Sequence, residues 1–88
     1  MPPAPVDAAA LSAWCVKFVA EMLERAPAEI DPNAKFSRIG LDSAMAVQLA
    51  VALEERLGVR LDPDVIADHP TIARLVAYLA TLSAGRAR

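Results

Sequence analysis

The chain has 88 residues and a mass of 9.4 kDa, the size of one small domain with a single core and no deep catalytic cleft. Hydrophobic residues make up 56% of the sequence and aromatic residues only 5%, so the composition predicts an aliphatic core and favours helices. The net charge of −2 excludes the basic face that nucleic-acid binding requires, and the single cysteine excludes a disulfide scaffold and a cysteine-based zinc site.

The first six residues contain three prolines and little to bury, so we expect a flexible N-terminal segment over residues 1–6. They lack the basic start and apolar core of a signal peptide. No apolar run in the chain approaches the roughly 20 residues of a membrane span. We therefore expect a cytoplasmic protein without membrane contact.

Apolar side chains recur with the period of an α-helix after Asp7, and Pro27 is expected to stop this first helix. Trp14 is predicted to anchor the core, and Cys15 to be a core residue and not a reactive thiol. The stripe consists of Leu11, Trp14, Cys15, Phe18, Val19, Met22 and Leu23.

The stretch from Ala26 to Asp42 contains prolines and a glycine, and it predicts a loop of unusual length for a compact domain, without regular structure. Four isolated apolar residues interrupt this loop. If they are anchored in the core, they keep the loop ordered. They are Ile30, Phe36, Ile39 and Leu41.

A second helix is predicted to begin at Asp42-Ser43 and to run to Leu57, with Gly58 as a left-handed stop. The helix is apolar nearly all round, which is unusual for a surface helix. Helical spacing places Leu49, Leu53 and Leu57 together on a face that can meet the core. It leaves a second stripe outside, made of Ala44, Val47, Gln48, Val51 and Glu55.

Two further helices complete an all-α bundle of three longer helices and one short one. Asp62-Pro63 predicts the start of the short helix, and Pro70-Thr71 the start of the last one, which Gly85 is expected to end. The last helix carries a stripe of Ile72, Leu75, Val76 and Leu79. The domain is expected to span residues 7–84, with a C-terminal tail over residues 85–88.

The segment Phe36–Leu49 reads FSRIGLDSAMAVQL. It resembles the phosphopantetheine attachment site of acyl and peptidyl carrier proteins. The pattern of that site is an apolar residue, glycine, any residue, Asp-Ser and then an apolar helix. Gly40, Asp42 and Ser43 fill this pattern. The resemblance extends over roughly residues 11–82 and is closer to polyketide synthase carriers than to bacterial fatty-acid carriers.

The resemblance implies an acyl carrier protein, which catalyses nothing itself, holds no metal and carries acyl intermediates as thioesters on a 4'-phosphopantetheine arm at Ser43. A phosphopantetheinyl transferase with magnesium would move this arm from coenzyme A to the serine. Asp42 is expected both to cap the helix and to engage the transferase. Further implied partners of the monomeric carrier are an acyltransferase or fatty acyl-AMP ligase, a ketosynthase and other domains of polyketide or related lipid biosynthesis.

The expected partner face departs from the family pattern. Ala44 stands where leucine is common, Gln48 stands where an acidic residue is frequent, and Arg38 adds a positive charge before the motif. We expect partners to contact a mostly apolar surface that begins beside the arm. Its residues are Arg38, Ala44, Val47, Gln48, Val51, Glu54 and Glu55.

Other interpretations stay open. Ser43 alone fits a simple helix cap, and Val47 and Val51 fit a helix face covered by a neighbour. A helical docking module without a covalent arm, or a peptidyl carrier of nonribosomal peptide synthesis, would share much of the pattern. A serine hydrolase does not fit, because the only histidine, His69, stands far from Ser43 in the sequence and is predicted to be a loop residue.

Overall fold

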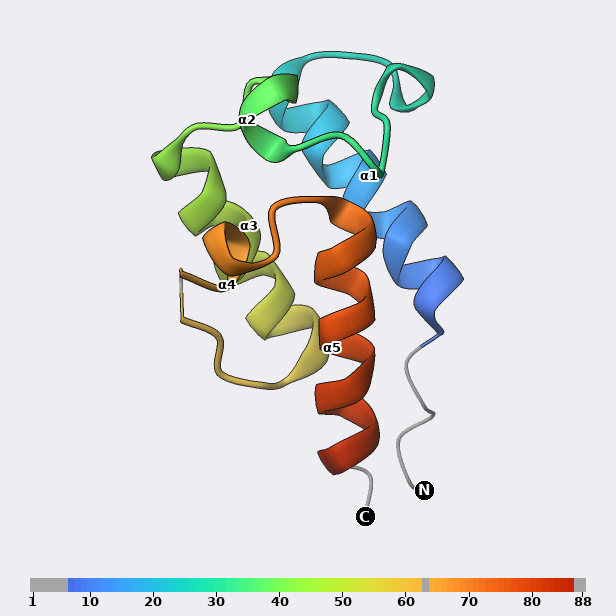
Figure 1. Cartoon of the computed structure of the whole chain (residues 1–88), viewed down its shortest axis with the longest axis vertical. Coiled ribbons are helices and arrows are strands. Elements are labelled where there is room, and N and C mark those ends of the chain that lie inside the picture. Colours follow the sequence, from blue (N-terminus) through green and yellow to red (C-terminus); the bar gives the residue numbers. More distant parts are fainter. Residues whose placement is uncertain (1–6, 63, 87–88) are drawn as a thin grey trace.

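A computed structural model describes residues 7–62 and 64–86 of the chain, with the side chains of residues 83–86 excepted (Figure 1). Within these residues the chain forms helices and no strand, which confirms the predicted all-α fold. The predicted flexible segment 1–6 and Pro63 lie outside the described residues. The elements are α1 (Ala8–Leu23), the short 3-10 helix η1 (Pro27–Glu29), α2 (Phe36–Ile39), α3 (Ser43–Leu57), α4 (Asp64–Asp68) and α5 (Ile72–Arg86).

The first helix, α1, begins as predicted but ends earlier than expected. The Asp7 side chain caps it by accepting a hydrogen bond from the Ala9 N–H at 3.0 Å. It ends at Glu24, which adopts a left-handed conformation with φ 55° and donates its N–H to the carbonyls of the last turn. Pro27, expected to stop α1, instead opens η1.

Trp14 is not the core anchor that the sequence suggested. It is partly buried and stacks on Phe18 with ring centroids 5.1 Å apart, while the Arg56 guanidinium lies 5.3 Å from the centre of the Trp14 ring. An aromatic ring this large fits better at the margin of α1 than in the narrow centre of a small domain. The core anchors of α1 are instead the fully buried Cys15 and Val19.

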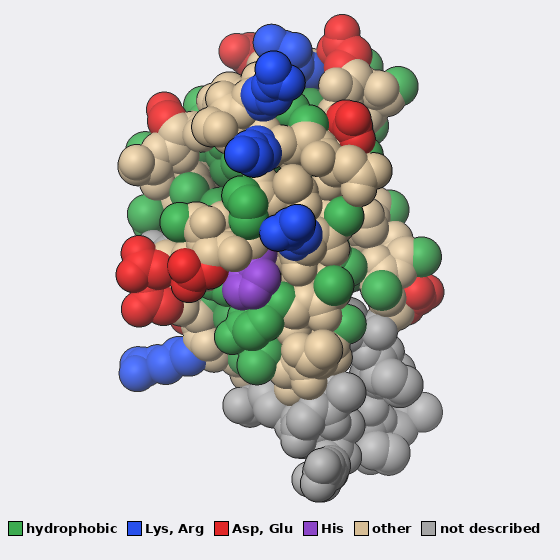
Figure 2. All heavy atoms as spheres, in the orientation of Figure 1, with side chains coloured by type: hydrophobic (Ala, Val, Ile, Leu, Met, Phe, Trp, Pro, Cys, Tyr) green, Lys and Arg blue, Asp and Glu red, His purple; other side chains and the backbone are tan. Residues whose placement is uncertain are grey.

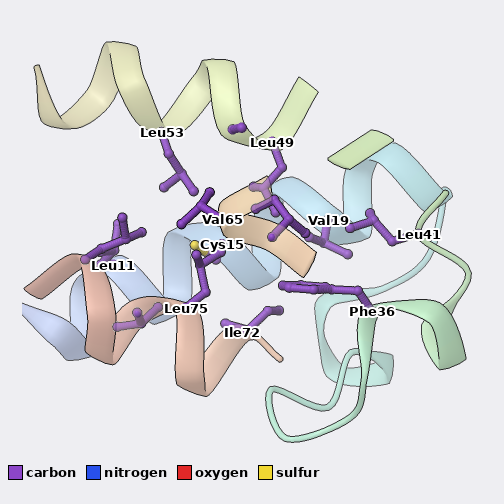
Figure 3. Packing of buried hydrophobic residues seen from close by; sticks show 14 of the residues in the cluster. Leu11, Cys15, Val19, Phe36, Leu41, Leu49, Leu53, Val65, Ile72 and Leu75 are labelled. Carbon is purple, nitrogen blue, oxygen red and sulfur yellow. The ribbon is translucent and has the colours of Figure 1, made fainter. Parts of the chain in front are cut away.

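The core lies between α1, α3 and α5 and is aliphatic, as the composition predicted. Leu49 and Leu53 point from α3 toward Cys15 on α1, and Ile72 and the other stripe residues of α5 face them (Figure 3). Leu57, also predicted to face the core, is only partly buried. Because Leu49 and Leu53 are completely buried, α3 has one face fixed inward and its opposite face outward.

The predicted start of α5 is confirmed, whereas its predicted end is wrong. It begins after Pro70-Thr71 as predicted, with the Thr71 hydroxyl oxygen accepting a hydrogen bond from the Arg74 N–H at 3.1 Å. It does not end at Gly85, because the helix continues to Arg86. A glycine costs only about 1 kcal/mol inside a helix, so one glycine near the end does not force a stop.

The long first loop is ordered, as predicted, but it is not free of regular structure, since η1 and the one-turn helix α2 form within it. Ile30, Phe36 and Leu41 are buried and Ile39 is partly buried. The apolar anchors thus lie within or just after two short helical turns, which their isolated positions in the sequence do not reveal. The loop and α2 lie at one end of the molecule, beside the start of α3 (Figure 1).

Candidate functional site

The site begins with the turn that leads from α2 into α3. Gly40 ends α2 with φ 101° and donates its N–H to the Phe36 carbonyl, and the Leu41 N–H bonds the same carbonyl at 2.9 Å. A side chain is strained at this φ, so glycine is the residue that the turn requires. Leu41 is buried and anchors the turn, which leaves Asp42 and Ser43 on the surface at the start of α3.

Asp42, and not Ser43, caps α3. Its side-chain oxygen Oδ1 accepts a hydrogen bond from the Met45 N–H at 2.8 Å, and its extended backbone has ψ −179°. Ser43 is exposed and is the first residue of the helix. Because Ser43 is exposed, its side chain is accessible from solvent, and none of the side-chain hydrogen bonds found among the described residues involves its hydroxyl.

A hollow of about 360 Å³ opens beside Ser43, between α2, α3 and α4. Four of its lining residues, Ser37, Asp42, Ser43 and Asp64, are polar, and the others are apolar. Its walls are formed by Phe36, Ser37, Leu41, Asp42, Ser43, Ala46, Val47, Asp64, Ile66, Ala67 and Pro70. The sequence did not predict Ser37, which α2 places in the wall, or the α4 residues, which the packing of α4 against α3 brings there.

The residues fit a phosphodiester-linked arm on Ser43. The first turn of a helix presents unpaired N–H groups, and a negative group near them is stabilised by about 0.3–1 kcal/mol. The exposed hydroxyl leaves room for a bulky substituent, and the apolar part of the adjoining hollow offers a surface to the pantetheine portion of the arm beyond the phosphate. Such a group supplies a terminal thiol that holds an acyl chain as a thioester.

The predicted outer stripe of α3 is on the surface. Val47 is 44% exposed and Val51 is 46% exposed, so no helix among the described residues covers them. Ala44, Gln48 and Glu55 of the same stripe are also exposed. Val47 and Val51, one helical turn apart, therefore form an exposed apolar patch on α3 that starts beside Ser43.

Of the charged residues predicted beside this stripe, Arg38 is exposed on α2. Glu54 is partly buried, and its carboxylate accepts a hydrogen bond from the Leu61 N–H at 3.1 Å. That contact fastens the connection between α3 and α4. Glu54 thus has a structural task, whereas Glu55 points to solvent.

The remaining candidate groups are structural. The His69 Nδ1 lies 3.0 Å from the Val65 carbonyl oxygen, and the ring stacks on Tyr78 with centroids 4.2 Å apart. Burial raises the pKa of the Cys15 thiol to about 12, against a smaller opposing effect of the Arg56 charge, so this cysteine stays protonated.

In the described part of the chain, no group of three or more metal-ligating side chains gathers. None of the described helices is long and apolar enough to cross a membrane.

Comparisons with known proteins identify the family and the fold of the chain. A family model described as "Phosphopantetheine attachment site" matches residues 14–79. The chain is 47% identical over 53 residues to a phenolphthiocerol/phthiocerol polyketide synthase of Mycobacterium tuberculosis, and the match covers 60% of this chain and 3% of that protein. It is 38% identical over 65 residues to the polyketide synthase Pks15/1 of Mycobacterium marinum, covering 74% of this chain and 3% of that protein. The chain thus spans only a small fraction of these relatives' length.

Solved structures share the fold. A free-standing peptidyl carrier protein from Acinetobacter baumannii is 37% identical, with a TM-score of 0.83, and the match covers 86% of this chain and 95% of that one. An acyl carrier protein from Anabaena, described as having a variant phosphopantetheinylation-site sequence, is 31% identical, with a TM-score of 0.82 and 94% coverage of both chains. The arrangement of α1, α3 and α5 is therefore that of carrier proteins.

Proposed function

The chain belongs to the phosphopantetheine attachment site family of carrier domains, and from this premise we propose that Ser43 is its attachment residue. The family's prosthetic group is 4'-phosphopantetheine, and a carrier domain acts by presenting a bound group to other enzymes. One observation supports Ser43 above all: Asp42 already caps α3, so the adjacent hydroxyl is exposed and has no structural task.

The chain's own residues prepare this hydroxyl for modification. Gly40 and the buried Leu41 fix the turn before α3, and the Asp42 cap fixes the first turn of the helix. The Ser43 hydroxyl consequently has a defined position, and we assign its activation to the phosphopantetheinyl transferase. We assign Asp42 a second role in contacting that transferase through its exposed carboxylate.

We propose a place for this carrier in polyketide or related lipid biosynthesis. The curated relatives described above are polyketide synthases, and the match in each lies over a short segment. An acyltransferase or fatty acyl-AMP ligase would load such a carrier, and a ketosynthase would receive the acyl group. The apolar stripe of α3, with Val47 and Val51 at its centre, is the surface on which we expect these partners to dock.

Intact-mass measurement tests the attachment. Incubation of the chain with coenzyme A, magnesium and a broad-specificity transferase is expected to add one phosphopantetheinyl group. The Ser37→Ala variant serves as a matched control, since Ser37 lines the same hollow, and it should gain the group normally. Addition to a Ser43→Ala variant, or no addition to the unmodified chain, would refute the proposal.

A peptidyl carrier is the second candidate, favoured by the likeness to the Acinetobacter baumannii carrier. Loading separates the two functions. The pantetheinylated chain is expected to accept a fatty acyl group from a fatty acyl-AMP ligase and to refuse amino acids from adenylation domains. Efficient aminoacylation with no fatty acylation would favour the peptidyl carrier.

A further inference from the structure

Three basic side chains gather across α2 and the start of α5. Lys35 directly precedes α2, Arg38 is in its only turn, and Arg74 is in the first turn of α5; all three are exposed. Lys35 and Arg74 border one hollow of about 560 Å³. We call these three residues the basic strip. Figure 2 shows Lys and Arg side chains following one another down this face, while Asp and Glu side chains lie toward its margins.

Backbone contacts hold the two parts of the basic strip together. The Phe36 N–H donates to the Pro70 carbonyl at 2.8 Å, and the Ala73 N–H donates to the Pro32 carbonyl at 2.9 Å. Lys35 and Thr71 also form an isolated antiparallel bridge. These contacts fix the backbone that carries the charges. Binding of a partner here therefore costs little conformational entropy of this backbone.

The basic strip adjoins the site at Ser43. Pro70 lines both the hollow beside Ser43 and the hollow of Lys35 and Arg74. Val47, at the start of the apolar stripe, lines the Ser43 hollow as well. A protein that approaches Ser43 thus meets an apolar helix face on one side and positive charge on the other.

The kind of partner follows from charge. The whole chain is acidic, with a net charge of −2, so an extended polyanion such as nucleic acid or an anionic membrane is repelled outside the strip. Three clustered cations suit a similarly small cluster of carboxylates. Resting on the proposed carrier function, we propose that the basic strip recognises an acidic polypeptide surface of a protein that docks beside Ser43.

A peptide titration tests this recognition. The full ¹⁵N-labelled chain, in its pantetheinylated form, is titrated with a hexaglutamate peptide at low salt while amide chemical shifts are followed. Shifts are expected at residues 35–38 and 71–74 and should vanish at high salt. Each of Lys35→Glu, Arg38→Glu and Arg74→Glu is expected to weaken binding about two- to fivefold, the range for single exposed ion pairs.

The matched control is Arg60→Glu, which makes the same charge change at an exposed arginine outside the strip and should leave the affinity unchanged. Equal weakening by Arg60→Glu, shifts outside the strip, or no binding would overturn the proposal, as would tighter binding to phosphatidylglycerol vesicles than to the peptide. Repeating the titration on Ser43→Ala separates the two proposals, because peptide binding should persist in a chain that cannot receive the arm.

Discussion

At the scale of single residues, Asp42 and Ser43 divide two tasks: Asp42 caps α3, and Ser43 is the proposed attachment residue. The Asp42 carboxylate satisfies the Met45 N–H, so the neighbouring serine is not needed for the stability of α3. The interpretation of Ser43 as a simple cap is therefore wrong. Substitutions at the two positions should accordingly separate stability from modification.

We expect Ser43→Ala to abolish pantetheinylation while changing the free energy of unfolding by less than about 0.5 kcal/mol, because an exposed serine at the first helical position becomes a good helix former. Asp42→Ala should cost about 0.5–2 kcal/mol through loss of the cap. Chemical denaturation and intact mass measure the two effects. A Ser43→Ala chain as unstable as Asp42→Ala would contradict this division.

At the scale of elements, the first loop depends on one large anchor. Phe36 is 5% exposed and lies among residues of the core, and it also begins α2 (Figure 3). We expect Phe36→Ala to lower the free energy of unfolding by about 3 kcal/mol or more, a large share of a small domain's stability. Thermal unfolding checks this value, with Phe18→Ala as a partly buried control of smaller effect. An unchanged melting temperature would show that the loop does not depend on this ring.

The two faces of α3 should respond oppositely to substitution. Val51→Asp on the exposed stripe is expected to leave the helical circular dichroism intact and to slow acyl loading and transfer, since it places a charge in an apolar docking face. Leu49→Ala on the buried face should cost about 2–5 kcal/mol and act through stability. A Val51→Asp chain that unfolds, or one that loads and transfers normally, would refute the docking face.

The sequence predicted elements whose ends have local signals, and it failed where packing decides. The bounds of α3 were predictable because Asp42 supplies a cap and Gly58 a left-handed stop. The end of α1 was not, because Glu24 is an unusual residue for a left-handed conformation. The motif was enough to propose Ser43 as the attachment residue, whereas the wall that α4 contributes to the hollow depends on contacts between distant segments.

At the scale of the whole molecule, the buried Cys15 thiol makes the free energy of unfolding depend on pH in the alkaline range. Cys15 has an ordinary pKa of 9.0 that folding raises to about 12, so between these values the unfolded chain releases a proton that the folded chain keeps. The free energy of unfolding should therefore fall as pH rises from 9.0 toward 12. Urea denaturation across this range should show a shallower fall for Cys15→Ala. An identical slope would mean that the thiol ionises equally in both states.

The hydrogen bonds that fasten the first loop to the start of α5 also bear on synthesis of the protein. They join Pro32 to Ala73 and Phe36 to Pro70. The segment before Ser43 therefore reaches its final form only after the start of α5 is available. On the ribosome, most of the domain must emerge before these non-local contacts can close. A nascent or truncated chain would expose Ser43 without the ordered approach to it.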